Sequence, residues 1–429
     1  MESKNFLFIS SDFLTSCDVA RRISEENHKV KVYIPNTRKG LEVYSGILDR
    51  VDNWQNFVDW ADIVIFDNTG FGKVANTLRQ NGKLVVGGSP YTDSLEMVRE
   101  FGQKELSEAG MKILEHHPFE NFDKAIEFIQ KNPSRYVFKP NGSAQNDKAI
   151  LFIGEEEDGG DILELLQSNK NLWKNKIRAF ILQKFASGVE VAIGAFFNGE
   201  NFLSPVNINF EHKRLFPGDI GPLTGDMGAM MYWDSFNSLY ASTLEKMITK
   251  LRASGYVGYF DINCIANSHA VFPLECTCRF GYPTLDTQIE GIKMPLGEFF
   301  YNLVTKKNFE IPVKKGFQIG VCCYAVPFIT KSHSDSNLYE DLPILFRGKK
   351  RDLEGIHLGD IKFIDGQYRI AGNSGYALVV TGSGHTVNDA RKEAYERIKK
   401  IRLQNMFYRV DIGERWYYDS DLLQTWGYL

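Results

Sequence analysis

The chain has 429 residues, which at about 150 residues per domain is enough for roughly three domains and a large buried core. Fifty Lys and Arg residues against 54 Asp and Glu residues give a net charge of −4, so the chain lacks the basic excess of an electrostatic nucleic-acid binder. Hydrophobic residues at 43% and charged residues at 24% exclude a disordered chain.

The N-terminus has no apolar signal-like region, and no stretch approaches the ~18 apolar residues of a membrane span. We therefore expect a cytoplasmic protein with no membrane partner. The six cysteines lack the CxxC pairs of a structural zinc site, so reduced thiols are expected. They are Cys17, Cys264, Cys276, Cys278, Cys322 and Cys323.

The first 90 residues or so alternate short apolar runs with polar helical stretches. The apolar runs at 6–9, 30–34, 63–66 and 84–86 predict buried parallel strands, and hence a small doubly wound α/β domain. The turn after the first strand, Ser10 to Ser16, lacks the glycine-rich pattern of a dinucleotide-binding turn, so we do not expect NAD to bind there.

Further along the chain, the pattern predicts a helix at 122–131, a strand that carries Lys139, and a strand pair within 179–197. A helix at 235–254 is expected next. The last part, from about residue 310, predicts strands at 316–325 and 377–380 and a helix from 387 to about 401 with one apolar face.

Two carboxylates stand in neighbouring apolar segments. Asp261 and Glu275 flank a turn-forming sequence at 266–269, so the segment reads as a hairpin on which both acids could face the same side and hold a hard cation. Adjacent buried carboxylates repel and need a cation to offset them. The alternative is that either acid forms an ordinary ion pair with Lys or Arg.

Two further segments have a composition typical of ligand-binding loops. Lys139 precedes small, turn-forming residues at 140–146 whose amides could approach phosphate oxygens, although a lysine at a strand end is common. Residues 211–229 combine dense charge with several glycines, which suits a loop around a charged ligand or simply a solvated loop. His212 has no nucleophile motif beside it, so a hydrogen-bonded loop histidine is favoured over a general base.

Taken in order, three segments resemble the phosphoribosylamine–glycine ligase family of ATP-grasp enzymes. Residues 211–214 (EHKR) and 219–229 (DIGPLTGDMGA) are similar to that family's DHKR and GPNTGGMGA sequences. Residues 275–283, with Thr287 and Gln288, are similar to its EFN-RFGDPE-TQ segment, and residues 408–413 to its YR-DIG segment. The resemblance covers nearly the whole chain.

The resemblance implies a mixed α/β and α+β architecture, an ATP-grasp fold. It places an N-terminal Rossmann-like pre-ATP-grasp domain at 1–104, a small ATP-grasp subdomain at 105–187, a large subdomain with the metal site at 188–309, and a C-terminal α+β domain at 310–429.

The resemblance also implies roles for individual residues. The cofactor-binding set is Arg99 and Lys139 for the phosphates, Gln183, Lys184 and Phe185 for adenine, and Glu190 for the ribose hydroxyls. The metal-binding set is Asp261, Glu275 and Thr277, the last in the place of an asparagine. The catalytic set is Arg279, expected on the transferred phosphate, with Lys213 and Arg214.

The activity implied is that of an ATP-dependent, ADP-forming carboxylate–amine ligase with ATP and Mg²⁺ as cofactors. Transfer of the γ-phosphate to a carboxylate gives an acyl phosphate, which an amine attacks as phosphate leaves. The substrates would be a small carboxylate such as glycine and an amine such as phosphoribosylamine, bound by a monomer or homodimer with no nucleic-acid partner.

Several positions depart from the family pattern, and they cluster where the carboxylate and amine substrates would bind. The GGREH-like N-terminal loop is replaced by Ser10 to Ser16, and the GGRVL-like segment at 373–377 lacks its arginine. Single replacements are Leu223, Asp226, Thr277 and Tyr282. Three hypotheses remain: a ligase for phosphoribosylamine or another amine, a catalytically inactive ATP-grasp scaffold that binds a nucleotide or partner, and an unrelated α/β sugar- or nucleotide-binding protein.

Overall fold

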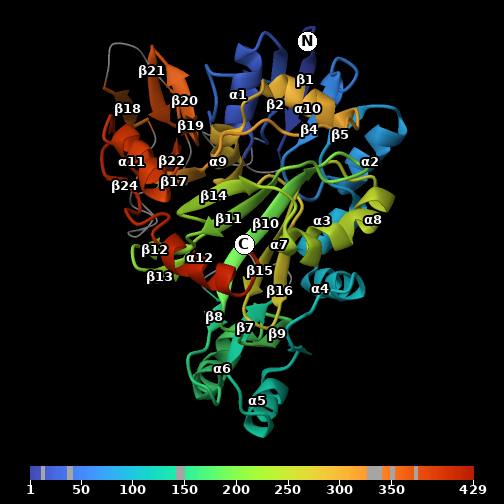
Figure 1. Ribbon diagram of the computed structural model, residues 1–429, viewed down its shortest axis with the longest axis vertical. Helices are drawn as coiled ribbons and strands as arrows, with labels where there is room; N and C mark the ends of the chain where they lie inside the picture. Colours follow the sequence, from blue (N-terminus) through green and yellow to red (C-terminus); the bar gives the residue numbers. More distant parts are fainter. Residues whose placement is uncertain (11–14, 36–41, 142–149, 326–340, 348–352, 372–374) are drawn as a thin grey trace.

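The structure is a computed structural model that describes residues 1–10, 15–35, 42–141, 150–325, 341–347, 353–371 and 375–429. Parts of three segments singled out above lie outside the described residues, namely 11–14 in the N-terminal turn, 142–149 after Lys139 and 372–374. Figure 1 shows an N-terminal domain at the top, a large central sheet, and a small lobe at the bottom.

The N-terminal domain is built on a parallel sheet in the order β3-β2-β1-β4-β5. Its strands are β1 (Asn5–Ile9), β2 (Lys29–Tyr33), β3 (Asp49–Arg50), β4 (Ile63–Phe66) and β5 (Leu84–Val86). The four predicted strands are confirmed: the apolar runs of β1, β4 and β5 are mostly buried, whereas β2 alternates buried Val30 and Val32 with more exposed residues. The strand order reverses between β1 and β4, and Ser10 and Asp67 follow the carboxyl ends of these two strands.

Helices α1 (Cys17–Glu25) and α2 (Gly72–Gln80) connect these strands, with the short 3-10 helix η1 (Trp54–Phe57). Helices α3 (Pro90–Met97) and α4 (Arg99–Glu108) then lead to the small lobe. Ser89 caps α3 through a reciprocal hydrogen-bond pair with Thr92, so the end of β5 and the start of the helix are rigidly joined.

The small lobe has its own antiparallel sheet and its own apolar core. The sheet order is β6 (His116–Phe119), β9 (Phe180–Lys184), β7 (Tyr136–Pro140) and β8 (Phe152–Ile153), with α5 (Phe122–Lys131) and α6 (Gly160–Trp173) packed on it. Phe138, Phe180 and Leu182 are completely or almost completely buried between sheet and helices. The predicted helix 122–131 matches α5 at both ends.

The central sheet has nine strands, in the order β16-β15-β10-β11-β14-β17-β22-β19 with β24 beside β17. In chain order these are β10 (Val189–Phe197), β11 (Val206–Glu211), β14 (Gly228–Asp234), β15 (Gly258–Ala266), β16 (Val271–Thr277), β17 (Phe317–Ala325), β19 (Ile356–Leu358), β22 (Tyr376–Gly384) and β24 (Met406–Phe407). Strands from both sides of residue 310 therefore belong to one sheet, and the C-terminal part is hydrogen-bonded directly to the ATP-grasp part.

Helices and small sheets complete the fold. The remaining helices are α7 (Ser238–Ser242), α8 (Leu244–Ser254), α9 (Thr284–Gly291), α10 (Leu296–Val304), α11 (Val387–Ile398) and α12 (Trp416–Thr425). A hairpin joins β12 (Arg214–Phe216) and β13 (Ile220–Leu223), and a four-stranded sheet contains β18 (Pro343–Phe346), β20 (Ile361–Ile364), β21 (Gln367–Ile370) and β23 (Ile401–Arg402). All six cysteines are buried and free, as expected.

The single helix predicted at 235–254 is wrong. Thr243 interrupts it with φ −132° and ψ −88°, which separates α7 from α8. The Thr243 hydroxyl donates a 2.6 Å hydrogen bond to the Leu239 carbonyl, and such local side-chain bonds compete with helix continuation. No helix among the described residues is long and apolar enough to cross a membrane.

A buried arginine fastens the C-terminal part to the β12–β13 hairpin. Arg409 has no exposed surface, and its guanidinium donates to Asp411, to Asp219 at 2.9 Å and to the Arg214 carbonyl at 2.7 Å. Bonds from one guanidinium to several acceptors fix both segments in one geometry.

We expect Arg409→Met to lower the free energy of unfolding by about 3 kcal/mol, because the substitution leaves the carboxylate of Asp411 without its cation. Chemical denaturation of both proteins measures the difference. Lys399→Met is the matched control, since Lys399 is exposed and pairs only on the surface with Glu396. An Arg409 variant as stable as the control would contradict the role of this arginine.

Candidate active site

The two predicted carboxylates lie on adjacent strands of the central sheet. In the hairpin of β15 and β16, Asp261 is opposite Thr277 and Asn263 is opposite Glu275. Directly opposed residues, and residues two apart along a strand, point to the same face of a sheet. The hairpin therefore presents four oxygen-bearing side chains on one face, which confirms the prediction for the two acids and adds Asn263.

Asp261 is the most strongly desolvated of these groups. It is 3% exposed, and its Oδ1 has no hydrogen-bond partner among the described residues. Burial, and then the charge of Glu211, raise the pKa of Asp261 well above its ordinary value, while a hydrogen bond from Thr277 opposes the shift. A buried carboxylate with an unsatisfied oxygen is a position that a cation would stabilise. Thr277 is placed to support Asp261 through this hydrogen bond.

Arg279 follows the hairpin and is held by an acid from the other side of the site. Its Nε donates to Glu96 Oε1 at 2.8 Å, and the Cys278 backbone N–H donates to Glu96 Oε2 at 2.7 Å. Asp261 and Glu275 also act on the Arg279 guanidinium and help raise its pKa, although burial opposes them. Glu96 lies on α3, 183 residues away along the chain, and no motif in the sequence indicated it.

The small lobe contributes cations. Lys139 is 8% exposed and donates a 2.5 Å hydrogen bond to Gln183 Oε1. Burial, and then the neighbouring charge of Arg99, lower the pKa of Lys139 to about 8, while Glu275 and Glu190 oppose the shift. Arg99 Nε has no hydrogen-bond partner among the described residues. Two close cations that repel each other form a site that would bind an anion.

Lys213 joins two acids at the edge of this site. Its Nζ lies 2.7 Å from Glu190 and 3.1 Å from Glu211. Burial lowers the pKa of Lys213, but Glu190 and then Glu211 raise it by more, so that it lies well above its usual value. The charge of Lys213 in turn lowers the pKa of Glu190. The structure thus places Lys213 among the carboxylates rather than on a free loop.

Three residues predicted for the site make their contacts at its margin. The Arg214 guanidinium donates to the Gly221 carbonyl at 2.6 Å, within the β12–β13 hairpin, which occupies 214–223 of the segment 211–229 expected as a loop. Lys184 pairs with Glu115 at 2.6 Å, and the Phe185 ring lies under the guanidinium of Arg135, 3.5 Å from its centroid. The described contacts of these three side chains are therefore with groups other than the carboxylates of the β15–β16 hairpin.

His212 serves the fold. Burial, and then Arg415 and Arg409, lower its pKa to about 3, so the ring is neutral. Its Nε2 accepts a 3.0 Å hydrogen bond from the Gly413 backbone N–H. The prediction of a hydrogen-bonded loop histidine is confirmed.

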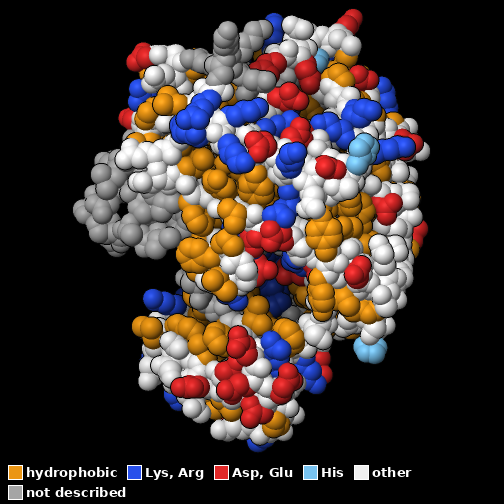
Figure 2. Space-filling view, turned by 60° about the vertical axis from the view of Figure 1, so that its left-hand side comes forward, with side chains coloured by type: hydrophobic (Ala, Val, Ile, Leu, Met, Phe, Trp, Pro, Cys, Tyr) orange, Lys and Arg blue, Asp and Glu red, His pale blue; other side chains and the backbone are white. Residues whose placement is uncertain are grey.

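These residues come from both lobes and meet in one place. Figure 2 shows the surface hollowed between the small lobe and the rest of the molecule, with acidic and basic side chains gathered in the hollow. An anion-binding pair beside desolvated carboxylates is the arrangement needed to hold a polyphosphate through both cationic side chains and a bridging metal.

Comparison with known proteins agrees with this geometry. Residues 98–285 match the family model described as phosphoribosylglycinamide synthetase, ATP-grasp (A) domain, and residues 341–415 match the model of its C domain. A phosphoribosylamine–glycine ligase of Streptococcus suis is 23% identical over 386 residues, which is 88% of each chain. One of Streptococcus pneumoniae is 23% identical over 420 residues, covering 92% of this chain and 96% of its own.

Solved structures show the same fold. A phosphoribosylamine–glycine ligase of Thermotoga maritima superimposes with a TM-score of 0.72 at 18% identity, covering 95% of this chain and all of that one. A biotin carboxylase of Campylobacter jejuni superimposes with a TM-score of 0.67 at 11% identity, covering 99% and 97% of the two chains.

The fold and the site define an ATP-grasp protein. Within that class the chain is similar in type to the phosphoribosylglycinamide synthetases, because models of two separate domains of that family match it. The predicted fold class is thereby confirmed.

The lowered pKa of Lys139 gives nucleotide binding a defined pH dependence. Only the protonated amine attracts phosphate oxygens, and bound phosphate raises its pKa, so binding above pH 8 should take up a proton and weaken as the pH rises. Calorimetry of ATP binding in buffers of different ionisation enthalpy measures this uptake. We expect Lys139→Met to abolish it, and unchanged uptake in that variant would contradict the assignment.

Proposed function

We propose that this protein is an ATP-dependent, ADP-forming ligase that joins a carboxylate to an amine through an acyl phosphate. The observation that carries the proposal is that two groups of side chains meet in one cleft. The β15–β16 hairpin and the residues after it contribute Asp261, Glu275 and Arg279. The small lobe contributes Lys139, and helix α4 contributes Arg99 beside it. Cations that bind phosphates thus lie beside carboxylates that bind metal.

The residues present fit a magnesium ion. Asp261 and Glu275 offer hard oxygen ligands on one face of the hairpin, and the unsatisfied, buried Oδ1 of Asp261 calls for a positive charge. We propose these two acids as the metal-holding residues, with Asn263 beside them as a further oxygen donor and Thr277 as the support of Asp261. Magnesium, when bound, neutralises charge on the phosphoryl oxygens.

The side chains of this protein account for the phosphoryl transfer. Lys139 and Arg99 would bind the polyphosphate, and Arg279, fixed by Glu96, would donate to the oxygens of the transferred group. A carboxylate is a poor electrophile, and phosphorylation converts it into an acyl phosphate that an amine can attack. The step needs no protein nucleophile, and a closed cleft protects the intermediate from water.

The remaining predicted residues keep their proposed roles in nucleotide binding. Gln183 and Lys184 end the strand β9 beside β7, which carries Lys139, and Phe185 follows them; we propose that this segment contacts adenine. Glu190, beside Lys213, is proposed to bind the ribose hydroxyls. The charge of Lys213 would keep Glu190 ionised, and Arg214 stays a proposed catalytic residue.

The substrate pair is proposed from the relatives, which are named phosphoribosylamine–glycine ligases and align over most of their length. Glycine is the proposed carboxylate and phosphoribosylamine the first amine to test. The relatives' names give no support to the hypothesis of an inactive scaffold.

We expect Glu275→Gln to reduce ADP formation at least about 100-fold, because the substitution keeps the shape of the side chain and removes a charge that metal binding needs. Thermal unfolding should be unchanged. The matched control is Glu310→Gln, which alters an exposed glutamate after α10. Undiminished ADP formation in the Glu275 variant would contradict the metal role.

The amine is identified by measuring ADP release with ATP, Mg²⁺ and glycine. One reaction contains phosphoribosylamine generated in situ, and the others contain different primary amines. We expect turnover with phosphoribosylamine. Turnover only with another amine would keep the ligase mechanism and replace this substrate, whereas ATP binding without any turnover would favour the inactive scaffold.

A further inference from the structure

A buried histidine lies where three parts of the chain meet, outside the phosphate site. His357 of β19 has no exposed surface. Its Nδ1 lies 2.8 Å from Asp18 Oδ2 of α1 and 3.5 Å from Asp286 Oδ1 of α9. Its Nε2 lies 3.0 Å from the hydroxyl of Thr381 in β22. The N-terminal domain, the ATP-grasp part and the C-terminal part thus share one side chain.

The contacts of Thr381 determine the proton on Nε2. The Thr381 hydroxyl donates a 2.8 Å hydrogen bond to Glu290 Oε2. Although burial opposes it, Arg397 and then Lys314 lower the pKa of Glu290 to about 2, so this carboxylate is ionised and can only accept. A hydroxyl has one proton, and that proton is directed to Glu290. His357 Nε2 must therefore carry a proton and donate it to Thr381.

The contact with Asp18 determines the proton on Nδ1. Burial favours the neutral acid, but Arg22 and His357 hold the pKa of Asp18 well below its usual range. Arg22 Nε donates to Asp18 Oδ2 at 2.7 Å, and Arg21 Nε donates to Asp18 Oδ1 at 2.9 Å. An ionised oxygen 2.8 Å from a nitrogen lone pair would be two acceptors in contact. His357 Nδ1 must therefore carry a proton as well.

We propose that His357 is held as an imidazolium and acts as a positioning residue, whose two N–H groups join helix α1 to the C-terminal strands and, through Asp286, to helix α9. The described partners of His357 all lie outside the phosphate site. The consequence for catalysis rests on the proposed ligase function, but the protonation state does not.

Helices α1 and α9 link this junction to the site. Asp18 lies in the first turn of α1, next to Ser16, whose backbone N–H and hydroxyl bond Asp67 Oδ2 at the carboxyl end of β4. Asp286 lies in the first turn of α9, seven residues after Arg279. The imidazolium thus fixes the carboxyl end of β4 relative to the segment that carries Arg279, and on the proposed function the amine acceptor would lie between the two.

The charged groups around His357 change its pKa in opposite directions. Facing His357 are Asp18 and Arg22 from α1 and Asp286 from α9, with Glu290, Arg397 and Lys314 beyond Thr381. Burial, with the charge of Arg22, brings the pKa of His357 below its ordinary value although the Asp18 carboxylate opposes the shift. The partners of both ring nitrogens nevertheless require the protonated ring, so the hydrogen-bond geometry determines the proton. Loss of the Nδ1 proton as the pH rises would leave Asp18 and Asp286 facing each other without the shared donor.

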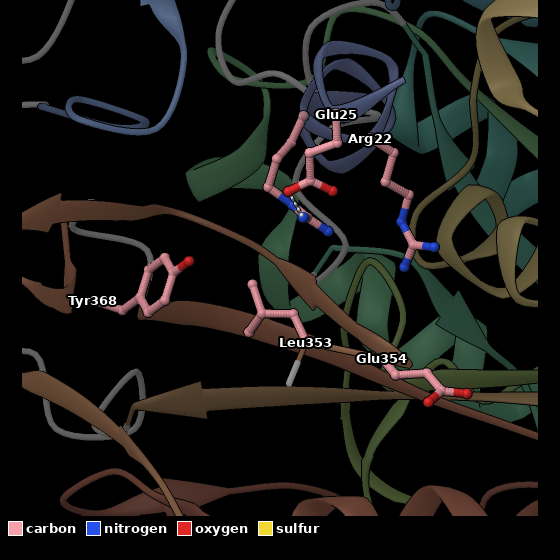
Figure 3. Close-up of a pocket in the computed structure, with 6 residues that line it drawn as sticks. Arg22, Glu25, Leu353, Glu354 and Tyr368 are labelled. Carbon is pink, nitrogen blue, oxygen red and sulfur yellow. Dashed lines mark hydrogen bonds and ion pairs between the residues drawn. The ribbon is translucent and has the colours of Figure 1, made fainter. Parts of the chain in front are cut away.

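Solvent can approach this junction. A cavity of about 390 Å³ lies between α1 and the C-terminal part, and Arg22, whose Nη2 is 3.5 Å from His357 Nδ1, lines it. Figure 3 shows Arg22 and Glu25 projecting from α1 on one side of the cavity, with Leu353, Glu354 and Tyr368 on the other. Proton exchange with water therefore needs no unfolding of the domains.

The protonation state is tested by nitrogen-15 NMR of the full chain with labelled histidine. We expect the ring of His357, assigned by its absence in His357→Gln, to show two N–H groups at neutral pH and to lose one as the pH rises. A ring protonated only on Nε2 at neutral pH, as would also be found if Nδ1 bound a metal ion, overturns the proposal. This readout does not depend on ligase activity.

The positioning role is tested by kinetics. We expect His357→Gln to raise the KM for the amine about tenfold, to leave ATP affinity within about twofold, and to remove the pH dependence of the amine KM while the pH dependence of ATP binding, which belongs to Lys139, remains. His269→Gln, at an exposed turn, is the matched control. Equal effects on ATP and amine, or an unchanged pH profile, would overturn the positioning role. Absence of turnover in the unaltered protein would instead contradict the proposed function.

Discussion

The structure depends on one electrostatic constraint, which is that several carboxylates are kept together in a place from which water is largely removed. Asp261 is desolvated by its strand position and repelled by Glu211 and Glu96, so its charge is tolerated only beside Arg279 or a bound cation. No single element supplies all of these groups. The hairpin of β15 and β16, helix α3 and the small lobe must converge for the charges to be offset, and that convergence forms the cleft.

The central sheet provides the rigidity that such a site needs. Strands that precede and follow residue 310 are hydrogen-bonded in one sheet, so the C-terminal part is a structural component of the ATP-grasp part. Two buried cationic side chains hold segments that lie outside the central sheet. Arg409 joins the β12–β13 hairpin to the C-terminal segment, and His357 joins α1 and α9 to β22. Both interactions link residues that lie far apart in the sequence.

The residues proposed to bind ATP and metal follow the family pattern more closely than the residues near the proposed substrate sites. Lys139, Glu190 and the two acids Asp261 and Glu275 follow the family pattern. The departures from that pattern are the N-terminal turn, the segment at 373–377, and the single replacements Leu223, Asp226, Thr277 and Tyr282. Asp226 accepts backbone hydrogen bonds from Gly228 at 3.0 Å and His212 at 3.3 Å, so this replacement also stabilises the base of the hairpin. Phosphoryl transfer from ATP has the same physical basis for many substrates. The residues that select the acceptor can therefore differ while the residues that bind ATP stay the same.

The sequence alone determined the features that depend on local periodicity. Strands β4 and β5 and helix α5 have the predicted bounds, and the spacing of Asp261 and Glu275 in a hairpin was enough to place both on one face. Only the tertiary structure decided the helix break at Thr243, the pairing of Glu96 with Arg279, the position of Asn263 beside Glu275 and the junction at His357. The reason is physical: side-chain periodicity acts over a few residues, whereas the partners of a buried charge are chosen by which distant segments the packed sheets bring within hydrogen-bonding distance.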